Sequence, residues 1–116
     1  MKQTVSLKLN REFRRLYQKG KSAVDPFLAV YCRKNRLGFS RLGLTVGTKV
    51  GHAVVRNRVR RRLRESYRVH EDRFRPGYDI VVVARGRAAG ARYAQLERSL
   101  LRLAGKLDLL KGEGEG

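Results

Sequence analysis

The segment from Arg56 to Arg68 places the strongest constraint on the fold, because it holds seven arginines in thirteen residues. Apolar residues recur through it at the spacing of a helix, which indicates that an ordered element displays the arginines. These residues are Val55, Val59, Leu63 and Tyr67. They occupy about a third of a helical wheel, and arginines occupy most of the remainder. Such a helix closes a core with one narrow stripe, so other segments must build that core.

Several further segments carry the signals of strands and supply the apolar surface that the basic helix needs. Residues 27–32 and 39–48 are rich in aliphatic and aromatic side chains, and residues 21–24 form a possible short strand. Residues 78–85 are apolar on both faces, which favours a central strand covered from both sides. In the first of these runs the faces should alternate, with Phe27, Ala29 and Tyr31 opposite Leu28, Val30 and Cys32.

Helical periodicity predicts three helices, of which the basic one covers residues 52–70. Asn10 is expected to cap a first helix that Gly20 ends, and a last helix covers residues 91–107. The resulting order α-β-β-β-α-β-α predicts an α/β (α+β) two-layer sandwich, in which helices pack on one sheet. We expect a single domain over residues 1–110 and a flexible C-terminal tail over residues 111–116.

The chain carries a formal net charge of +18, from 28 Lys and Arg against 10 Asp and Glu. Residues 1–64 hold 18 of the basic side chains and 2 of the acidic ones, for a net charge of +16. Twenty of the 28 basic residues are arginine, which binds phosphate through paired hydrogen bonds and stacks on bases. The pattern favours a nucleic-acid partner over a solvated basic face, and over a basic helix that binds calmodulin or a membrane surface.

The sequence contains no clear set of catalytic or metal-binding side chains. His52 and His70 have no cysteine or acid at metal-ligand spacing, and a single cysteine, Cys32, excludes an intramolecular disulfide. The longest apolar runs are too short to span a bilayer, and the N-terminus lacks the apolar segment of a secretory signal. We therefore expect a cytoplasmic binding protein.

Three aromatic residues have two open interpretations. Phe13 and Tyr17 lie one turn apart on the first expected helix, and Tyr31 lies on an expected strand. Each either packs in the core, as aromatic side chains usually do, or stacks on an unpaired base of a nucleic acid.

Residues 43–61, G-L-T-V-G-T-K-V-G-H-A-V-V-R-N-R-V-R-R, closely resemble the signature of the bacterial ribonuclease P protein subunit. The hallmark of that family is an Arg-Asn-Arg tripeptide that opens a basic helix, with a glycine and an alanine before it. The positions that match it are Gly51, Ala53, Arg56, Asn57, Arg58, Arg60 and Arg61. Residues 7–20 and 78–85 also resemble the family, so the similarity extends over residues 5–107.

The resemblance implies a ribosomal S5 domain 2-like fold with a left-handed β-α-β crossover, which is an exception to the usual handedness. It implies that this chain is the protein subunit of ribonuclease P, the endoribonuclease that matures the 5′ end of tRNA. Catalysis there belongs to the RNA subunit, which requires Mg²⁺, so this chain would have no catalytic residues and no tightly bound cofactor. The expected partners are ribonuclease P RNA and precursor tRNA, with no membrane and no required protein partner.

Matching positions carry the family's binding residues onto this chain. The expected RNA-subunit-binding residues are Arg56, Asn57, Arg58, Arg61 and Lys49. The expected lining of a cleft that holds the 5′ leader of precursor tRNA is Phe13, Tyr17, Ala29, Tyr31, Arg60 and Arg64. Thr48 stands where the family often has a second basic residue, so no role is carried over to it. Two other hypotheses stay open, a non-enzymatic ribosomal or RNA-assembly binding protein and a nuclease that acts without an RNA subunit.

Overall fold

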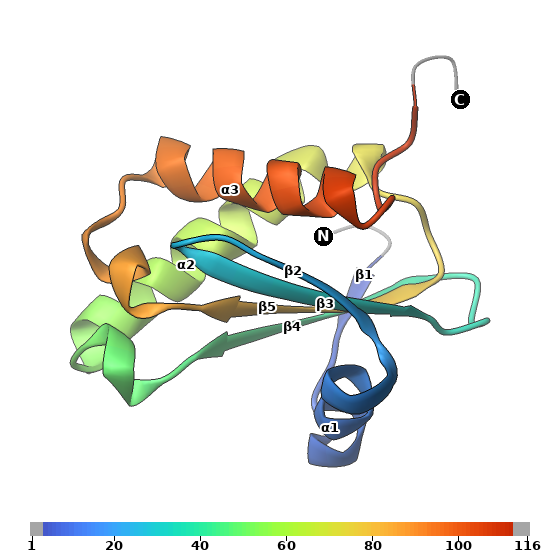
Figure 1. Cartoon of the computed structure of the whole chain (residues 1–116), viewed down its shortest axis with the longest axis horizontal. Coiled ribbons are helices and arrows are strands. Elements are labelled where there is room, and N and C mark those ends of the chain that lie inside the picture. The colour runs from blue at the N-terminus through green and yellow to red at the C-terminus, as the bar shows by residue number, and fades with distance from the viewer. Residues whose placement is uncertain (1–3, 113–116) are drawn as a thin grey trace.

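The structure is a computed structural model that describes residues 4–112. One five-stranded sheet has the strand order β1-β4-β5-β3-β2. Helices α2 and α3 cover one face of this sheet, and α1 lies against part of the other face (Figure 1). The elements are β1 (Thr4–Ser6), α1 (Asn10–Lys19), β2 (Lys21–Val24), β3 (Leu28–Lys34), β4 (Ser40–Val46), α2 (Ala53–His70), β5 (Tyr78–Ala84) and α3 (Tyr93–Lys106). The short 3₁₀ helices between them are η1 (Thr48–Val50), η2 (Glu71–Arg73) and η3 (Gly86–Gly90).

This arrangement confirms the α+β class and every predicted helix and strand. Helix α1 adds a partial third layer, because it packs on the face of the sheet opposite α2 and α3. β5 is the central strand, parallel to β4 and antiparallel to β3. Ile80 faces the core under α2 and α3, and Val81 faces α1. A strand buried from both sides needs apolar residues at successive positions, which explains its continuous apolar run.

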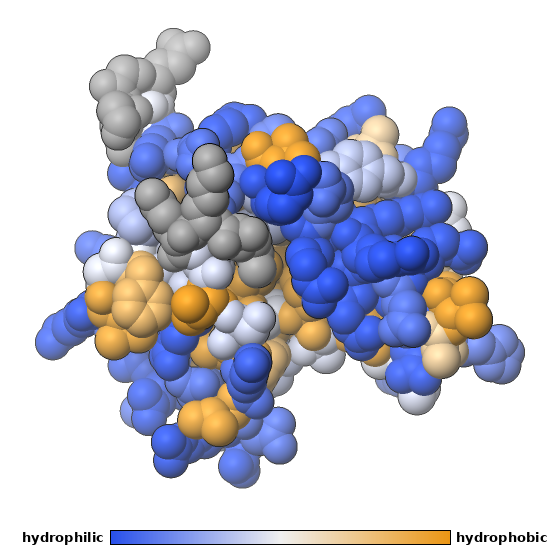
Figure 2. All heavy atoms as spheres, turned by 180° about the vertical axis from the view of Figure 1, so that it is seen from behind, coloured by the Kyte–Doolittle hydropathy of each residue, from blue (hydrophilic) through white to orange (hydrophobic). Residues whose placement is uncertain are grey.

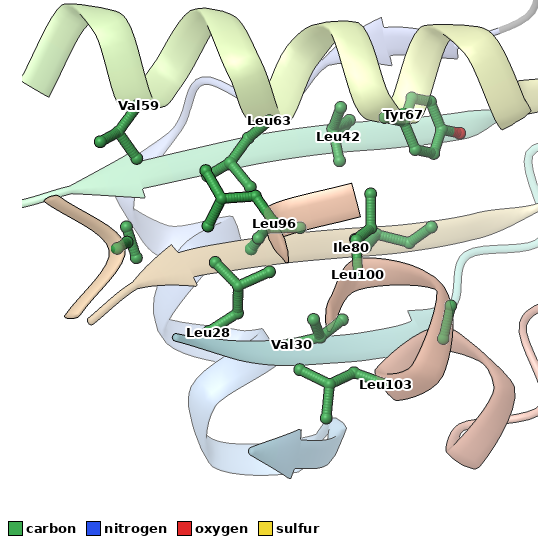
Figure 3. Close-up of a cluster of buried hydrophobic side chains, with 14 of the residues drawn as sticks. Leu28, Val30, Leu42, Val59, Leu63, Tyr67, Ile80, Leu96, Leu100 and Leu103 are labelled. Atoms are coloured by element: carbon green, nitrogen blue, oxygen red, sulfur yellow. The ribbon is translucent and has the colours of Figure 1, made fainter. Parts of the chain in front are cut away.

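The main core lies between the sheet and the pair of helices α2 and α3 (Figure 3). From α2 it receives Val59, Leu63 and Tyr67, each at most 1% exposed. From α3 it receives Leu96, Leu100 and Leu103. The apolar stripe predicted for the basic helix is therefore confirmed, and its burial decides which sides of α2 face solvent.

Helix α2 connects two parallel neighbours in the sheet, β4 and β5. Figure 3 views the sheet from the helix side, and β4 (at Leu42) and β5 (at Ile80) both point to the left, with β5 below β4. When the view is turned so that these strands point upward, β5 lies to the left of β4. The crossover is therefore left-handed, as the resemblance implied and against the strong general preference.

The N-terminal region differs from the sequence-based expectation in two ways. A short strand, β1, pairs in parallel with β4, and three residues are too few to show a strand pattern in the sequence. Asn10 is not the cap of α1, because Leu9 holds the N-cap position and Asn10 is the first helical residue. The backbone amide of Leu9 donates a hydrogen bond to Glu12 Oε1 at 3.4 Å. The side chain of Glu12 therefore takes part in capping the helix, and the predicted asparagine does not.

Gly20 ends α1 as predicted, but the need for glycine there is steric and does not come from a left-handed backbone conformation. Its φ of −79° lies outside the left-handed region that usually favours glycine at a helix end. A Cβ at this position would lie 2.6 Å from the carbonyl oxygen of Leu16 and 2.8 Å from that of Cys32. The close approach of α1 to β3 therefore requires a residue without a side chain.

The chain beyond α3 returns to the segment before β5. Phe74 and Leu110 form an isolated β-bridge, and the amide of Lys111 donates to the carbonyl of Arg73 at 2.7 Å. The expected C-terminal tail thus begins at a residue whose backbone is held in place. Residues 113–116 of that tail lie outside the described residues.

Asp25 joins the turn between β2 and β3 to α3. Its carboxylate accepts the backbone amides of Phe27 and Leu28, each at 2.8 Å, and hydrogen bonds from Ser99 and Arg102. Burial alone would raise the pKa of Asp25. The hydrogen bonds from Ser99, the Leu28 amide, Arg102 and the Phe27 amide outweigh it, so the pKa lies below its ordinary value of 3.8.

We expect Asp25→Asn to lower the free energy of unfolding at neutral pH by about 1–3 kcal/mol, because an amide cannot accept all of these bonds. A carboxyl whose pKa is lower in the folded state stabilises the fold above its unfolded pKa, and that stabilisation disappears as pH falls through the folded pKa. The difference between the two proteins should therefore shrink as pH falls below about 4. Urea unfolding at a series of pH values measures it, and a difference independent of pH would contradict the role of the ionised form.

Candidate nucleic-acid interface

The burial of one stripe of α2 divides its arginines between two flanks. On one flank, Arg60 and Arg64 line a hollow together with Phe13 of α1 and Leu44 of β4. On the other flank, Arg62 donates from Nη1 to the carbonyl of Ala91 at 2.7 Å. Arg62 therefore attaches the helix to the segment before α3, whereas Arg60 and Arg64 face the side of the molecule where α1 lies.

The outer surface of α2 carries most of the expected RNA-subunit-binding residues. Asn57, Arg58 and Arg61 are exposed on it, and Lys49 is exposed on η1, just before the helix. Figure 2 shows a nearly continuous hydrophilic surface on the side of the molecule where α2 lies. Elsewhere on the helix, Arg68 donates from Nε to Glu65 Oε2 at 2.9 Å, which neutralises part of the charge near its C-terminal end.

Arg56 differs from Asn57, Arg58 and Arg61 in being half-buried. Its Nε atom is buried and has no hydrogen-bond partner among the described residues. The burial of this atom separates Arg56 from an ordinary solvated arginine.

The expected leader cleft lies between α1 and the sheet. A hollow there is lined by Phe13, Tyr17 and Thr45, together with Asn10 and Arg14. The Tyr17 and Tyr31 rings meet edge to face, with centroids 4.9 Å apart and an interplanar angle of 80°. The structure thus brings the predicted aromatic residues together, and Tyr17 stays 41% exposed.

Core packing is confirmed in part for the aromatic residues, and base stacking stays a prediction. Phe13 and Tyr31 pack against the small core under α1, and neither is fully buried. Ala29 is buried in β3, where it lies on the same face of the strand as Tyr31. Phe13 lines the hollow of Tyr17, whereas Ala29 and Tyr31, which were also expected in the cleft, are not among the residues that line it.

The hollows form one continuous track across the molecule. Phe13 borders both the cleft of Tyr17 and the hollow of Arg60 and Arg64. The same two arginines border a third hollow, which reaches Asn57 and Arg61 on the outer surface of α2. Arg60 also donates from Nη1 to Asn57 Oδ1 at 2.9 Å. The two sets of residues predicted from the sequence are thus adjoining parts of one surface.

Sequence reasoning missed the residues that hold this surface in shape. Arg41 of β4 forms ion pairs with Glu12 of α1 and with Asp79 of β5, the latter at 2.6 Å. The hydrogen bonding of the Arg41 guanidinium to the Asp79 carboxylate is the main cause that raises the pKa of Arg41, although burial opposes it. These ion pairs attach α1 to the sheet at one end of the cleft. Their partners lie far apart in the sequence, so no local pattern predicts them.

The described residues contain no group of three or more His, Cys, Asp or Glu side chains that could hold a metal ion. His70 of α2 lies 3.0 Å from Glu97 Oε2 of α3, so it joins two helices. Cys32 is buried in β3, and burial raises the pKa of its thiol. Within the same residues, no helix is both long and apolar enough to cross a membrane.

Comparison with known proteins gives one consistent result. The family model described as Ribonuclease P matches residues 1–108. The ribonuclease P protein component of Alkaliphilus oremlandii is 41% identical over 110 residues, which cover 95% of this chain and 96% of the relative. That of a Thermoanaerobacter species is 42% identical over 108 residues, covering 93% of both chains.

Solved structures agree with the sequence comparison. The RNase P protein of Staphylococcus aureus superposes with a TM-score of 0.85 at 33% identity, covering 91% of this chain and 97% of that protein. The RNase P protein of Thermotoga maritima superposes with a TM-score of 0.78 at 32% identity, covering 92% of this chain and 98% of that protein. The fold expected from the resemblance is thereby confirmed, and the chain belongs to the bacterial ribonuclease P protein family.

Proposed function

We propose that this chain binds the RNA subunit of a bacterial ribonuclease P and the 5′ leader of precursor tRNA, and so promotes the 5′ maturation of tRNA. Family membership supports the role as a subunit. The observation that carries the two binding sites is the continuous track from Tyr17 through Phe13 and Arg60 to the exposed surface of α2 at Asn57. Cleavage itself would be the work of the RNA subunit and its Mg²⁺.

The two parts of the track suit two kinds of RNA. A single-stranded leader has no fixed sequence, so aromatic stacking together with phosphate contacts can hold it whatever its bases. The cleft offers Tyr17 and Phe13 for stacking, and Arg60 and Arg64 for phosphates. A folded RNA presents phosphates at fixed positions, which the exposed guanidinium groups of Arg58 and Arg61 can bind in defined geometry.

Reconstitution tests the proposal directly. The protein is mixed with a bacterial ribonuclease P RNA at low Mg²⁺, and cleavage of precursor tRNA is compared with that by the RNA alone. We expect the protein to stimulate cleavage at the 5′ end of the mature tRNA, and to show no cleavage without the RNA. Absence of stimulation, with binding to ribosomal RNA instead, would support the alternative of a ribosomal or RNA-assembly protein.

Two substitutions should separate the two binding sites. We expect Phe13→Ala to weaken binding of precursor tRNA about 5- to 150-fold, with little change for mature tRNA, because stacking on a base contributes about 1–3 kcal/mol. Arg58→Ala should instead weaken binding of the RNA subunit and leave the preference for precursor over mature tRNA unchanged. Filter binding measures each affinity, with Phe13→Leu as the control that keeps an apolar side chain. Equal losses for precursor and mature tRNA would refute the cleft assignment of Phe13.

A further inference from the structure

The loop between β3 and β4, residues 35–39, holds two apolar side chains out in solvent. Leu37 is 46% exposed and Phe39 is 40% exposed. The loop lies at one end of the sheet (Figure 1), and Figure 2 shows exposed hydrophobic side chains at that end of the molecule. The three hollows of the proposed track are lined by other residues and include none of this loop. The leader cleft therefore does not account for this apolar tip.

Hydrogen bonds of one residue, Asn35, fix the shape of the loop. Its Nδ2 atom donates to the carbonyl of Phe39 and to Asp79 Oδ1, both at 3.0 Å. Its Oδ1 atom accepts the amide of Leu37 at 2.9 Å, and its own amide donates to the carbonyl of Gly77 at 2.9 Å. These bonds close the loop from inside and attach it to β5 and the segment before it. Side chains on a fixed loop lose little conformational entropy when they bind a partner.

The backbone of the loop is left-handed at two residues, Arg36 with a φ of 62° and Gly38 with a φ of 81°. Glycine adopts this conformation readily, whereas an arginine does so only at a conformational cost. A glycine at residue 36 would therefore suit the backbone better. What the arginine contributes is a positive charge, which is exposed at the tip beside the apolar side chains.

Three cations surround the apolar tip. Arg33, Lys34 and Arg36 are exposed, and none of them forms an ion pair with another residue that the structure describes. Successive residues of a strand point to opposite faces, so Arg33 and Lys34 place charge on both sides of the sheet. On the helix side, Lys34 lines a hollow to which Lys111 and Tyr78 also contribute. The apolar tip thus lies within a positively charged surface.

We propose that the loop between β3 and β4 binds an unpaired nucleotide of the RNA subunit, as a second contact separate from the surface of α2. Folded RNAs display unpaired bases in loops and bulges, and proteins bind these bases by stacking aromatic side chains on them. The Phe39 ring and the Leu37 side chain pack on the base, and the three cations around them bind the phosphates on either side. This inference rests on the proposed binding of the RNA subunit and adds a site to it.

The position of the loop favours the RNA subunit as the partner. The loop precedes β4 and η1 follows it, so the loop and Lys49 lie at opposite ends of a strand of seven residues, about 20 Å apart. Helix α2 runs back along the sheet from η1 toward the end where the loop lies (Figure 1). Its exposed arginines therefore connect the two regions, and a large folded RNA can contact both. A second copy of this chain suits the tip less well, because each copy carries a net charge of +18 and repels the other.

A photo-crosslink tests the site and the source of the RNA. Leu37→Cys carries a photoreactive group on its new thiol, whereas the native Cys32 is buried and protected from labelling. Val24→Cys is the matched control, because Val24 is 49% exposed and lies at the opposite end of β3 from the loop. In the complex with ribonuclease P RNA and precursor tRNA, we expect Leu37→Cys to crosslink to one segment of the RNA subunit that Val24→Cys does not reach. Crosslinks only to precursor tRNA, or only between copies of the protein, would overturn the inference.

Substitution of Phe39 tests the stacking itself. We expect Phe39→Ala to weaken binding of ribonuclease P RNA about fivefold or more, because one base loses its stacking partner. Phe39→Tyr keeps an aromatic ring and should retain the affinity, as should Val24→Ala. The preference for precursor over mature tRNA should stay unchanged in all three, which separates this site from the cleft of Phe13. Filter binding measures the affinities.

The fold of the loop should survive these changes, because Asn35 bonds to the backbone carbonyl of Phe39 and not to its side chain. Urea unfolding checks that the variants are as stable as the unsubstituted protein. Equal affinities of Phe39→Ala and Phe39→Tyr for ribonuclease P RNA would overturn the inference. If Phe39→Ala still stimulates cleavage of precursor tRNA in that case, the proposed function stands without this second contact.

Discussion

Raising the salt concentration from about 50 to about 200 mM should weaken binding of ribonuclease P RNA to this protein about a thousandfold. Each phosphate that an arginine or lysine neutralises releases a condensed counterion, and salt opposes that release. The exposed cations of α2 and η1 are sufficient for about six such contacts, which gives a slope of about −5 for the logarithm of the association constant against that of salt concentration. Filter binding at a series of salt concentrations measures this slope.

Two substitutions test which surface of the protein makes the phosphate contacts that determine the salt dependence. Arg61→Gln should reduce its magnitude by about one, because one phosphate contact is lost. Arg98, which is exposed on α3, offers a matched control, and Arg98→Gln should leave the slope unchanged. A flat response to salt would contradict binding through phosphates. Equal effects of both substitutions would show that general charge, and not the α2 surface, determines the affinity.

Leu63→Ala should lower the free energy of unfolding by about 2–5 kcal/mol. Leu63 is 1% exposed and lies in the middle of the stripe that holds α2 to the sheet (Figure 3). The substitution removes buried methyl groups and leaves a cavity that close-packed neighbours fill only in part. Because a small domain is stable by only about 5–15 kcal/mol, this is a large fraction of the total.

The same substitution should weaken both of the proposed RNA-binding activities, although Leu63 itself is buried and out of reach of RNA. The arginines of α2 hold their positions only while the helix is packed on the sheet. Val69→Ala is the control on the same helix, since Val69 is 53% exposed and its truncation should change stability by less than about 0.5 kcal/mol. Urea unfolding measures both values. Loss of stability in Leu63→Ala no larger than in Val69→Ala would contradict this account of the packing.

Local patterns predicted most of the fold because each element buries a face with its own periodicity. The alternation in residues 27–32 predicted that Leu28 and Val30 face away from Tyr31, and the structure confirms this, with the first two in the main core and Tyr31 under α1. The prediction was wrong for Phe27, which packs against the main core, because it precedes β3 and the alternation holds only within the strand. The continuous apolar run of β5 predicted a central strand for the same reason. β1 was missed, because its three residues are held by pairing with β4 and by the bond between Thr4 and Tyr67, which are distant in the sequence.

The proposed binding residues divide in the same way between sequence and tertiary structure. Their identity follows from the sequence, where the basic helix and its resemblance to the family single out Arg56, Asn57 and Arg58. Their arrangement does not, because the adjacency of Arg60 to Phe13 depends on how α1 and α2 lie at the edge of β4. The ion pairs of Arg41 are a further long-range feature of this kind.

The sequence by itself determined a basic helix with a single buried stripe, the order of the elements and a chemistry suited to RNA. These properties depend on the spacing and charge of neighbouring residues. Only the tertiary structure decided that the aromatic cleft and the arginine surface adjoin one another, through Phe13, Arg60 and Arg64. The physical reason is that this adjacency depends on how α1 and α2 pack beside β4, which brings together residues that are far apart in the sequence.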